Sequence, residues 1–164
     1  MDIHVFWDGP WEFPQFDSLS NSKDYGVYQI YGLHPIYGDS VLLYVGKAVA
    51  QRFSTRLRQH EWLKTGYKED ELKVYIGRLA GRMKVTDEEW EDRIGLAEEL
   101  LIHSHQPVYN IRNKQTINEE RIMNVHVFNW GASKKLFPEV SGRRFTSKFD
   151  HISEEHIYRC EDNE

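Results

Sequence analysis

The chain has 164 residues, of which 40% are hydrophobic and 13% aromatic, and its formal net charge is −5 at pH 7. These values argue against a disordered chain and predict a single domain, residues 1–164, long enough to bury a core. No apolar stretch approaches the roughly 20 residues of a membrane span, and the N-terminus lacks a signal-peptide pattern. Because Cys160 is the only cysteine, we expect a cytoplasmic protein without an intrachain disulfide.

The first elements expected along the chain are strands. Residues 3–7 are an apolar run that predicts a strand, which Asp8-Gly9-Pro10 should end. Residues 26–31 and 41–45 are rich in β-branched and aromatic residues, and glycine, proline and aspartate separate them. They are therefore expected to be the two strands of a hairpin.

Helices and strands alternate in the rest of the chain. We expect a helix at 51–63, a strand at 72–77, a helix at 86–105, a strand at 125–129, a loop at 138–142 and a short helix at 153–158. Thr86 is the expected N-cap of the long helix, and Pro107 should follow its end. This order predicts a mixed α/β fold of the α+β type, with a small central mixed or antiparallel sheet flanked by helices.

The long helix carries a carboxylate inside its apolar face. That face is made of Trp90, Ile94, Ala97, Leu101 and Ile102. Glu98 falls between these residues at spacings of three and four, whereas Glu99 should point about 100° away, toward the polar face. Because an uncompensated buried carboxylate is unfavourable, Glu98 is predicted to meet a cation, a metal or a hydrogen-bond network.

The net charge argues against a nucleic-acid partner, but the distribution of charge weakens that argument. Between positions 47 and 64, five basic residues stand against the single acid Glu61: Lys47, Arg52, Arg56, Arg58 and Lys64. On this evidence alone, a basic face is more often simply solvated than a track for phosphates.

The predicted helix at 51–63 has basic residues next to its apolar side. Phe53 and Leu57 form that side, and Arg56 and His60, four residues apart, should face the sheet edge together with Arg52. A guanidinium and an imidazole in this position could hold a phosphate and transfer a proton. The alternative is that Arg56 pairs with a nearby acid and His60 is a satisfied, half-buried histidine.

Five segments give a more specific signal together than any of them gives alone. In chain order they are Gly26-Val27-Tyr28, Tyr44-Val45-Gly46-Lys47-Ala48, Arg56-Leu57-Arg58-Gln59-His60, Ala97-Glu98-Glu99-Leu100-Leu101-Ile102 and Pro107-Val108-Tyr109-Asn110. This arrangement resembles the GIY-YIG nuclease family. The resemblance covers residues 24–112 as a catalytic core, with 1–23 and 113–164 as elaborations. Tyr75-Ile76-Gly77 spells part of the family name, but it falls in the predicted strand at 72–77 and is expected to be an ordinary strand segment.

The resemblance implies a catalytic set of Tyr28, Tyr44, Arg56, His60 and Glu98. Glu98 would hold one divalent metal ion, Mg²⁺ or Mn²⁺. Tyr28 would activate the attacking water with help from Tyr44, Arg56 would neutralise the phosphate, and His60 would relay a proton. A free tyrosine has a pKa near 10, so Tyr28 needs a nearby cation to act as a base at neutral pH.

Further residues follow from the same resemblance. The expected phosphate or DNA contacts are Lys47, Arg52, Arg58 and Asn110, and Asn110 would also brace the pocket through hydrogen bonds. Gly46 would let the backbone come close at the end of its strand.

The expected function is that of a DNA endonuclease that hydrolyses phosphodiester bonds. The segments look closest to stand-alone restriction-type members, which reach the two strands of DNA as dimers, so a homodimer is one expectation. The alternatives are a structure-selective repair or recombination nuclease, and a catalytically inactive module that binds nucleic acid or protein.

Other signals are weaker. His103 and His105 are expected to be surface or helix-end histidines rather than metal ligands, because no cysteine pair or acidic motif of zinc-site spacing is near. Trp7, Trp11 and Trp130 are expected in packing, although stacking on unpaired bases is an alternative. Basic residues at 134–135, 143–144 and 148 suit DNA backbone contacts and solvated loops equally well.

Overall fold

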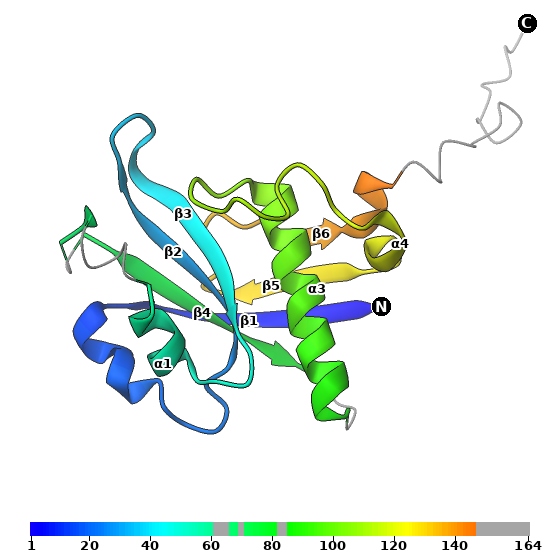
Figure 1. Ribbon diagram of the computed structural model, residues 1–164, viewed down its shortest axis with the longest axis horizontal. Helices are drawn as coiled ribbons and strands as arrows, with labels where there is room; N and C mark the ends of the chain where they lie inside the picture. Colours follow the sequence, from blue (N-terminus) through cyan, green and yellow to red (C-terminus); the bar gives the residue numbers. More distant parts are fainter. Residues whose placement is uncertain (61–65, 69–70, 82–84, 147–164) are drawn as a thin grey trace, which may run out of the picture.

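The computed structural model describes residues 1–60, 66–68, 71–81 and 85–146. The elements in this part of the chain are β1 (Asp2–Trp11), η1 (Phe13–Ser18), β2 (Gly26–His34), β3 (Gly38–Ala48), α1 (Phe53–Arg58), β4 (Lys73–Ala80), α3 (Asp87–His105), α4 (Glu119–Ile122), β5 (His126–Gly131), β6 (Glu139–Ser141) and η2 (Gly142–Phe145). Among these residues, six strands form one sheet in the order β3-β2-β4-β1-β5-β6 (Figure 1). β1 and β5 are parallel, and the other neighbouring pairs are antiparallel. The expected α+β fold with a small mixed sheet flanked by helices is confirmed.

Several predicted elements are confirmed with shifted ends. β2 and β3 form the expected hairpin, β4 includes residues 73–77 of the strand predicted at 72–77, and β5 includes residues 126–129 of the strand predicted at 125–129. α3 begins after Thr86, whose side chain accepts a hydrogen bond from the backbone of Glu89, as expected for an N-cap. α1 occupies the first part of the helix predicted at 51–63. The prediction is wrong at residues 59–60, because α1 ends at Arg58 with Gln59 as its C-cap and His60 is not helical. Residues 61–63, and the helix predicted at 153–158, lie outside the described residues.

Two predictions about chain breaks are wrong. Asp8-Gly9-Pro10 does not end β1, because the strand continues to Trp11 through a bulge between Asp8 and Trp11. Gly9 has φ +143° there, and a Cβ atom would lie 2.8 Å from the carbonyl oxygen of Val74 on β4. The loop predicted at 138–142 contains the short strand β6, which pairs with β5 at the sheet edge. The bulge lies against β4, a strand distant in sequence, whereas β6 depends on pairing with β5, the strand before it.

The two faces of the sheet carry separate groups of apolar residues. α3 crosses one face and contacts β2, β3, β5 and β6 (Figure 1). Val5, Val27 and Val45 belong to the apolar cluster of that face. On the other face, Phe53 and Leu57 of α1 pack with residues of η1 and with the buried residues of β2 and β4. β3 is the edge strand, so both layers end beside it.

The edge of β3 is covered by the segment that follows α3. Val108 donates its backbone N–H to Leu42 at 3.2 Å, and Tyr109 donates to Leu43 at 2.8 Å. These bonds satisfy part of an edge that would otherwise be open to other chains. None of the helices in the described part of the chain is long and apolar enough to cross a membrane.

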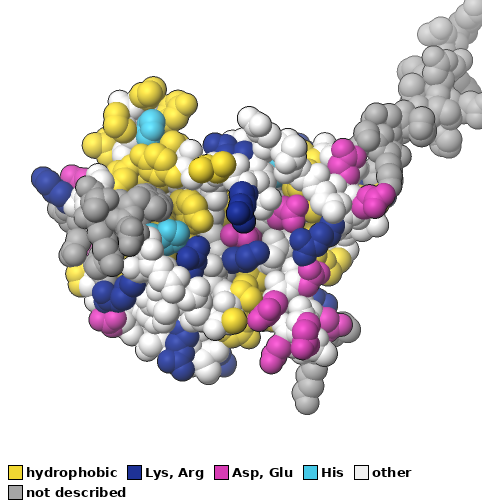
Figure 2. Space-filling model, in the orientation of Figure 1, with side chains coloured by type: hydrophobic (Ala, Val, Ile, Leu, Met, Phe, Trp, Pro, Cys, Tyr) yellow, Lys and Arg dark blue, Asp and Glu magenta, His cyan; other side chains and the backbone are white. Residues whose placement is uncertain are grey.

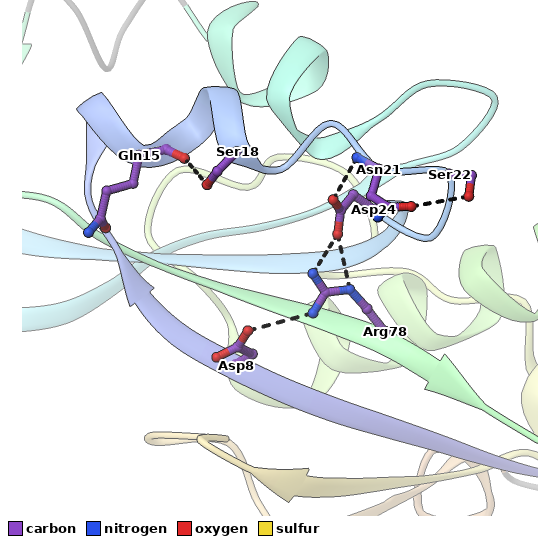
Figure 3. A network of polar contacts seen from close by, with 7 residues as sticks. All are labelled: Asp8, Gln15, Ser18, Asn21, Ser22, Asp24 and Arg78. Carbon is purple, nitrogen blue, oxygen red and sulfur yellow. Dashed lines mark hydrogen bonds and ion pairs between the residues drawn. The ribbon is translucent and has the colours of Figure 1, made fainter.

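A buried ion pair anchors the beginning of β2 to β4. Arg78 of β4 donates its Nε to Asp24 at 3.2 Å and lies 3.6 Å from Asp8 of β1 (Figure 3). The Asp24 side chain is only 6% exposed and also accepts the backbone N–H of Asn21 at 2.8 Å. The carbonyl oxygen of Asp24 accepts the N–H of Phe53 at 2.7 Å, so the same residue positions the start of α1.

We predict that Arg78→Ala lowers the free energy of unfolding by about 3 kcal/mol, because it leaves the buried Asp24 carboxylate without its cation. Arg58→Ala is the matched control, because its partner Asp17 is 78% exposed. The control should change the free energy of unfolding by less than about 1 kcal/mol. Urea unfolding followed by circular dichroism measures both variants. Equal effects would show that the Asp24–Arg78 pair has no special weight in the fold.

Candidate active site

A cavity of about 700 Å³ lies beside β3, where the two layers end. It collects side chains from β3, α1, α3 and the segment after α3. Its lining residues are Tyr44, Lys47, Arg56, Glu91, Gly95, Glu98, Glu99, Ile102, Tyr109, Asn110, Ile111, Arg112, Asn113 and Arg121. Five residues predicted for the site therefore face one cavity: Tyr44, Lys47, Arg56, Glu98 and Asn110. On this face of the molecule, Lys and Arg side chains gather next to α3 (Figure 2).

Glu98 of α3 meets a cation, as its place in the apolar face predicts. Its carboxylate lies 2.9 Å from Nζ of Lys47 on β3, and its side chain is 15% exposed. Burial raises the pKa of Glu98, while the hydrogen bond and charge of Lys47 and the charge of Arg56 lower it and offset part of that effect. The acid therefore connects the helix to the edge strand at the floor of the cavity.

Glu99 does not point to an open polar face, which corrects the helical-wheel prediction. Its side chain is 12% exposed and lies 3.2 Å from Nη1 of Arg121 on α4. Arg121 also pairs with Asp92, and the backbone N–H of Asn118 donates to Glu99 at 3.4 Å. The wheel could not predict this cover, because α4 arrives from a later part of the chain.

Tyr28 and His60 form a hydrogen-bonded pair behind the cavity wall. The Tyr28 hydroxyl lies 2.6 Å from Nε2 of His60, and both residues are buried. The Tyr44 ring lies beside this pair, with its centroid 5.0 Å from that of His60 and 6.1 Å from that of Tyr28. The three rings thus form one cluster, of which Tyr44 lines the cavity.

Gly46 is required by this ring cluster. It lies opposite Tyr28 in the β2–β3 register. A Cβ atom at position 46 would lie 2.5 Å from the Tyr28 hydroxyl oxygen and 2.6 Å from the Tyr44 ring. The close approach expected at Gly46 is therefore an approach between the backbone of β3 and the two phenols.

Burial decides the protonation of the Tyr28–His60 pair. Burial, together with the nearby charge of Arg56, lowers the pKa of His60 to about 4. Burial also raises the pKa of Tyr28 far above its ordinary value of 10.0, although Arg56 lowers it in part. The pKa of Tyr44 is raised by burial and by the charge of Glu98. At neutral pH both members of the pair are uncharged, and a single proton lies between Tyr28 and His60.

Arg56 alone of the three arginines of the 52–58 segment lines the cavity. It is half-buried, and its Nη1 donates to Oε1 of Gln59 at 3.1 Å. Arg58 instead lies 2.7 Å from Asp17 of η1. Arg52 is exposed and lines a separate cavity of about 400 Å³ with Tyr25 and Trp90. Arg52 and Arg58 are therefore not brought together with the rest of the predicted site.

Asn110 braces the edge strand. Its Oδ1 accepts the N–H of Val45 at 2.9 Å, and its Nδ2 donates to the carbonyl oxygen of Val45 at 2.8 Å. The expected bracing hydrogen bonds are thus present, and they run to the backbone of β3 midway between Tyr44 and Gly46. They fix the strand that carries Tyr44 and Lys47.

Sequence reasoning missed two arginines of the cavity, Arg112 and Arg121. Arg112 follows the matched Pro107–Asn110 segment by two residues, and this proximity could have marked it as a candidate site residue. Arg121 lies on α4, a one-turn helix of four residues that no sequence pattern predicted. Its place in the cavity depends on its contacts with α3.

The two helix-end histidines and Trp7 have structural partners. Nε2 of His105 accepts the N–H of Phe137 at 2.9 Å, its Nδ1 lies 3.0 Å from the carbonyl oxygen of Leu101, and burial lowers its pKa. Nδ1 of His103 lies 3.2 Å from the carbonyl oxygen of Asn113. Trp7 is buried and donates Nε1 to Asn129 at 2.8 Å, so it packs in the core.

The chemistry of the cavity fits a divalent cation that keeps most of its water. Within the described residues, no group of three or more His, Cys, Asp or Glu side chains could hold a metal ion. Glu98, the ligand that the resemblance implies, lines the cavity together with Glu91 and Glu99. Mg²⁺ suits such a site, because it retains several waters and is often held by one or two carboxylates together with substrate phosphate.

Comparisons of the chain with protein-family models, curated proteins and solved structures find no match. The resemblance to GIY-YIG nucleases therefore depends on the five sequence segments. Their side chains nevertheless meet at one place in the fold, and this convergence is the basis of the functional proposal.

We predict that His60 makes the protein less stable at acid pH. His60 stays neutral in the folded chain down to about pH 4, whereas the unfolded chain binds the proton near pH 6.5. Between these values the unfolded state holds more protons, so stability is lost as the pH falls through this window. His60→Gln keeps a neutral partner for Tyr28, and it should reduce the loss of unfolding free energy between pH 7 and pH 4.5 by about 2 kcal/mol.

Urea unfolding at the two pH values measures this difference, and NMR titration of the His60 ring gives the pKa directly. A loss of stability that is identical in the wild type and in His60→Gln would show that His60 takes up its proton without disturbing the fold.

Proposed function

We propose that the protein is a metal-dependent DNA endonuclease of the GIY-YIG type, which hydrolyses phosphodiester bonds with one divalent cation, Mg²⁺ or Mn²⁺. The observation that carries this proposal is the convergence of Tyr44, Lys47, Arg56 and Glu98 on one cavity. These four residues come from three separate elements. A phenol, two cations and a carboxylate are the groups that phosphodiester hydrolysis requires for water activation and charge neutralisation.

Lys47 and Arg56 are suited to bind the scissile phosphate. Both line the cavity, and Arg56 presents a planar guanidinium that can contact two phosphate oxygens. Lys47 lies 2.9 Å from Glu98, which places a positive charge next to the carboxylate that would hold the cation. The cation would add charge to stabilise the phosphate and the leaving oxygen. The two arginines beyond the predicted set, Arg112 and Arg121, extend the basic lining of the same cavity.

The Tyr28–His60 pair is suited to receive the proton of the attacking water. A free phenolate at Tyr28 is unfavourable, because burial raises the pKa of this residue. The 2.6 Å contact with a neutral His60 offers another route. Because Tyr28 is buried, the proton of the water would reach its oxygen with the help of the Tyr44 hydroxyl, which lines the cavity. The proton of Tyr28 would pass to Nε2 of His60, so the pair would end as a neutral phenol and a protonated imidazole. Tyr44, which lines the cavity beside this pair, would orient the water.

In this proposal, DNA is bound by the single unit of sheet and helices that the described residues form. Restriction-type enzymes of this family cut both strands as dimers, and a homodimer of this chain would place two such cavities on one duplex. An inactive binding module would keep the basic cavity and cleave nothing.

We predict that Glu98→Gln abolishes cleavage of supercoiled plasmid in the presence of Mg²⁺, because the neutral amide cannot hold the cation. The neighbouring Glu99→Gln is the matched control, since Glu99 also lines the cavity but pairs with Arg121, and it should retain activity. Discrete fragments from the wild type would indicate a site-specific enzyme, and nicks or smears a less selective one. Plasmid left intact by the wild type with either metal would favour the inactive binding module. Cleavage by Glu98→Gln would exclude the proposed metal ligand.

We also predict that Arg56→Ala lowers kcat about 100-fold, as the loss of a donor to developing charge does in other enzymes. Arg58→Ala is the control from the same helix, because Arg58 lies against Asp17 instead of lining the cavity. It should change kcat by less than about 3-fold, with a modest rise in KM if it touches the DNA backbone. Equal losses in the two variants would mean that general positive charge, and not Arg56, supports the reaction.

A further inference from the structure

Three aromatic rings run from the cavity onto the turn between β2 and β3. Tyr109 lines the cavity, and its ring centroid is 6.0 Å from that of His34 at the end of β2. The His34 ring in turn stacks on Tyr37, with centroids 4.7 Å apart and planes inclined by 22°. We call Tyr109, His34 and Tyr37 the ring row. The proposed function does not use it.

The outer end of the ring row is open to solvent. Tyr37 is 67% exposed, and the exposed side chains of Leu33 and Ile36 flank it. Figure 2 shows hydrophobic side chains over the β2–β3 hairpin, the part of the fold to which these residues belong, with Lys and Arg side chains on the side toward α3. An exposed apolar patch that continues into a basic cavity is more typical of a binding surface than of scattered surface residues.

The rings are held in place before any ligand binds. Nδ1 of His34 accepts the backbone N–H groups of Ile36 and Tyr37, both at 3.2 Å. The Tyr109 hydroxyl lies 2.7 Å from the hydroxyl of Tyr67. The backbone N–H of Tyr109 donates to the carbonyl oxygen of Leu43 on β3. A ligand that stacks on such rings loses little affinity to the ordering of side chains.

We propose that the ring row is a subsite that stacks unpaired bases of a DNA strand whose phosphates enter the cavity. This inference rests on the proposed function and names the substrate class for it. Inside a duplex each base face is covered by its neighbours, so away from the duplex ends an unpaired nucleotide is needed to offer a face to Tyr37. Stacking needs no particular base, because every base has a π face. The subsite would therefore favour DNA with a single-stranded extension next to the cleavage point.

Four cations line the cavity against three acids, Glu91, Glu98 and Glu99, so a nucleic-acid strand matches the cavity and the ring row better than an apolar peptide does. Lys47, Arg56 and Arg112 line the cavity that Tyr109 shares. A nucleic-acid strand carries a flat base and a negative phosphate in each nucleotide, so it can contact the ring row and the cavity at the same time. A protein partner would contact the exposed apolar side chains, but the basic residues of the adjoining cavity would then have no part in binding.

Fluorescence anisotropy of the full-length protein tests the subsite without cleavage. The probes are a labelled duplex and the same duplex with a single-stranded extension, both in EDTA. The wild type should bind the extended probe more tightly, and Tyr37→Ala should reduce that preference about 10-fold. Tyr37→Phe should keep it, because stacking needs the ring and not the hydroxyl. Phe6→Ala, which removes a ring that is 57% exposed on β1, is the matched control and should also keep the preference.

An absent preference in the wild type, or a preference that survives in Tyr37→Ala, would overturn the inference and leave the patch to a protein partner. Cleavage of both probes in Mg²⁺ is measured in parallel. Phe6→Ala, which lies outside the ring row, should leave that cleavage unchanged. If the wild type cleaves neither DNA but keeps the ring-dependent preference, the nuclease proposal fails and the base-stacking subsite remains.

Discussion

The contact between Glu98 and Lys47 joins the two parts of the molecule that define the cavity. α3 packs on one face of the sheet with Ile94, Ala97 and Leu101 buried, and Glu98 emerges from that same face at its margin. There it meets β3 at 2.9 Å. A carboxylate in such a position needs a cation nearby. This contact therefore fixes the position of α3 relative to β3 and places the two charges side by side at the site.

The edge position of β3 explains why the cavity forms at this place. Tyr44 and Lys47 are three residues apart on the strand, so their side chains point toward opposite faces of the sheet. Only at an edge strand can residues of both faces border the same space. The Asn110 amide, bonded at both ends to Val45, fixes the strand between them. On the α1 side, Gly46 leaves the room in which Tyr28 and His60 meet.

The features that could be predicted from the sequence are those that depend on local spacing. Glu98 was found from the three- and four-residue periodicity of α3, and the β2–β3 hairpin from its turn formers. The environment of Glu99 was missed, because Arg121 reaches it from a helix of four residues. The DNA contact predicted for Arg58 stays a prediction, and the ion pair of Arg58 with Asp17 of η1 could not be foreseen from the sequence. The course of β1 through Gly9 was missed because the bulge is shaped by β4. Each miss comes from a partner that is distant in sequence, which periodicity does not reveal.

The central claim is that Glu98 holds a divalent cation when DNA is bound in the cavity. The most direct measurement is Mn²⁺ binding by electron paramagnetic resonance, with the protein in complex with a short DNA duplex. The account predicts one bound ion in the wild type and in Glu99→Gln, and its loss in Glu98→Gln with DNA binding retained. An equal amount of bound Mn²⁺ in Glu98→Gln would contradict the account.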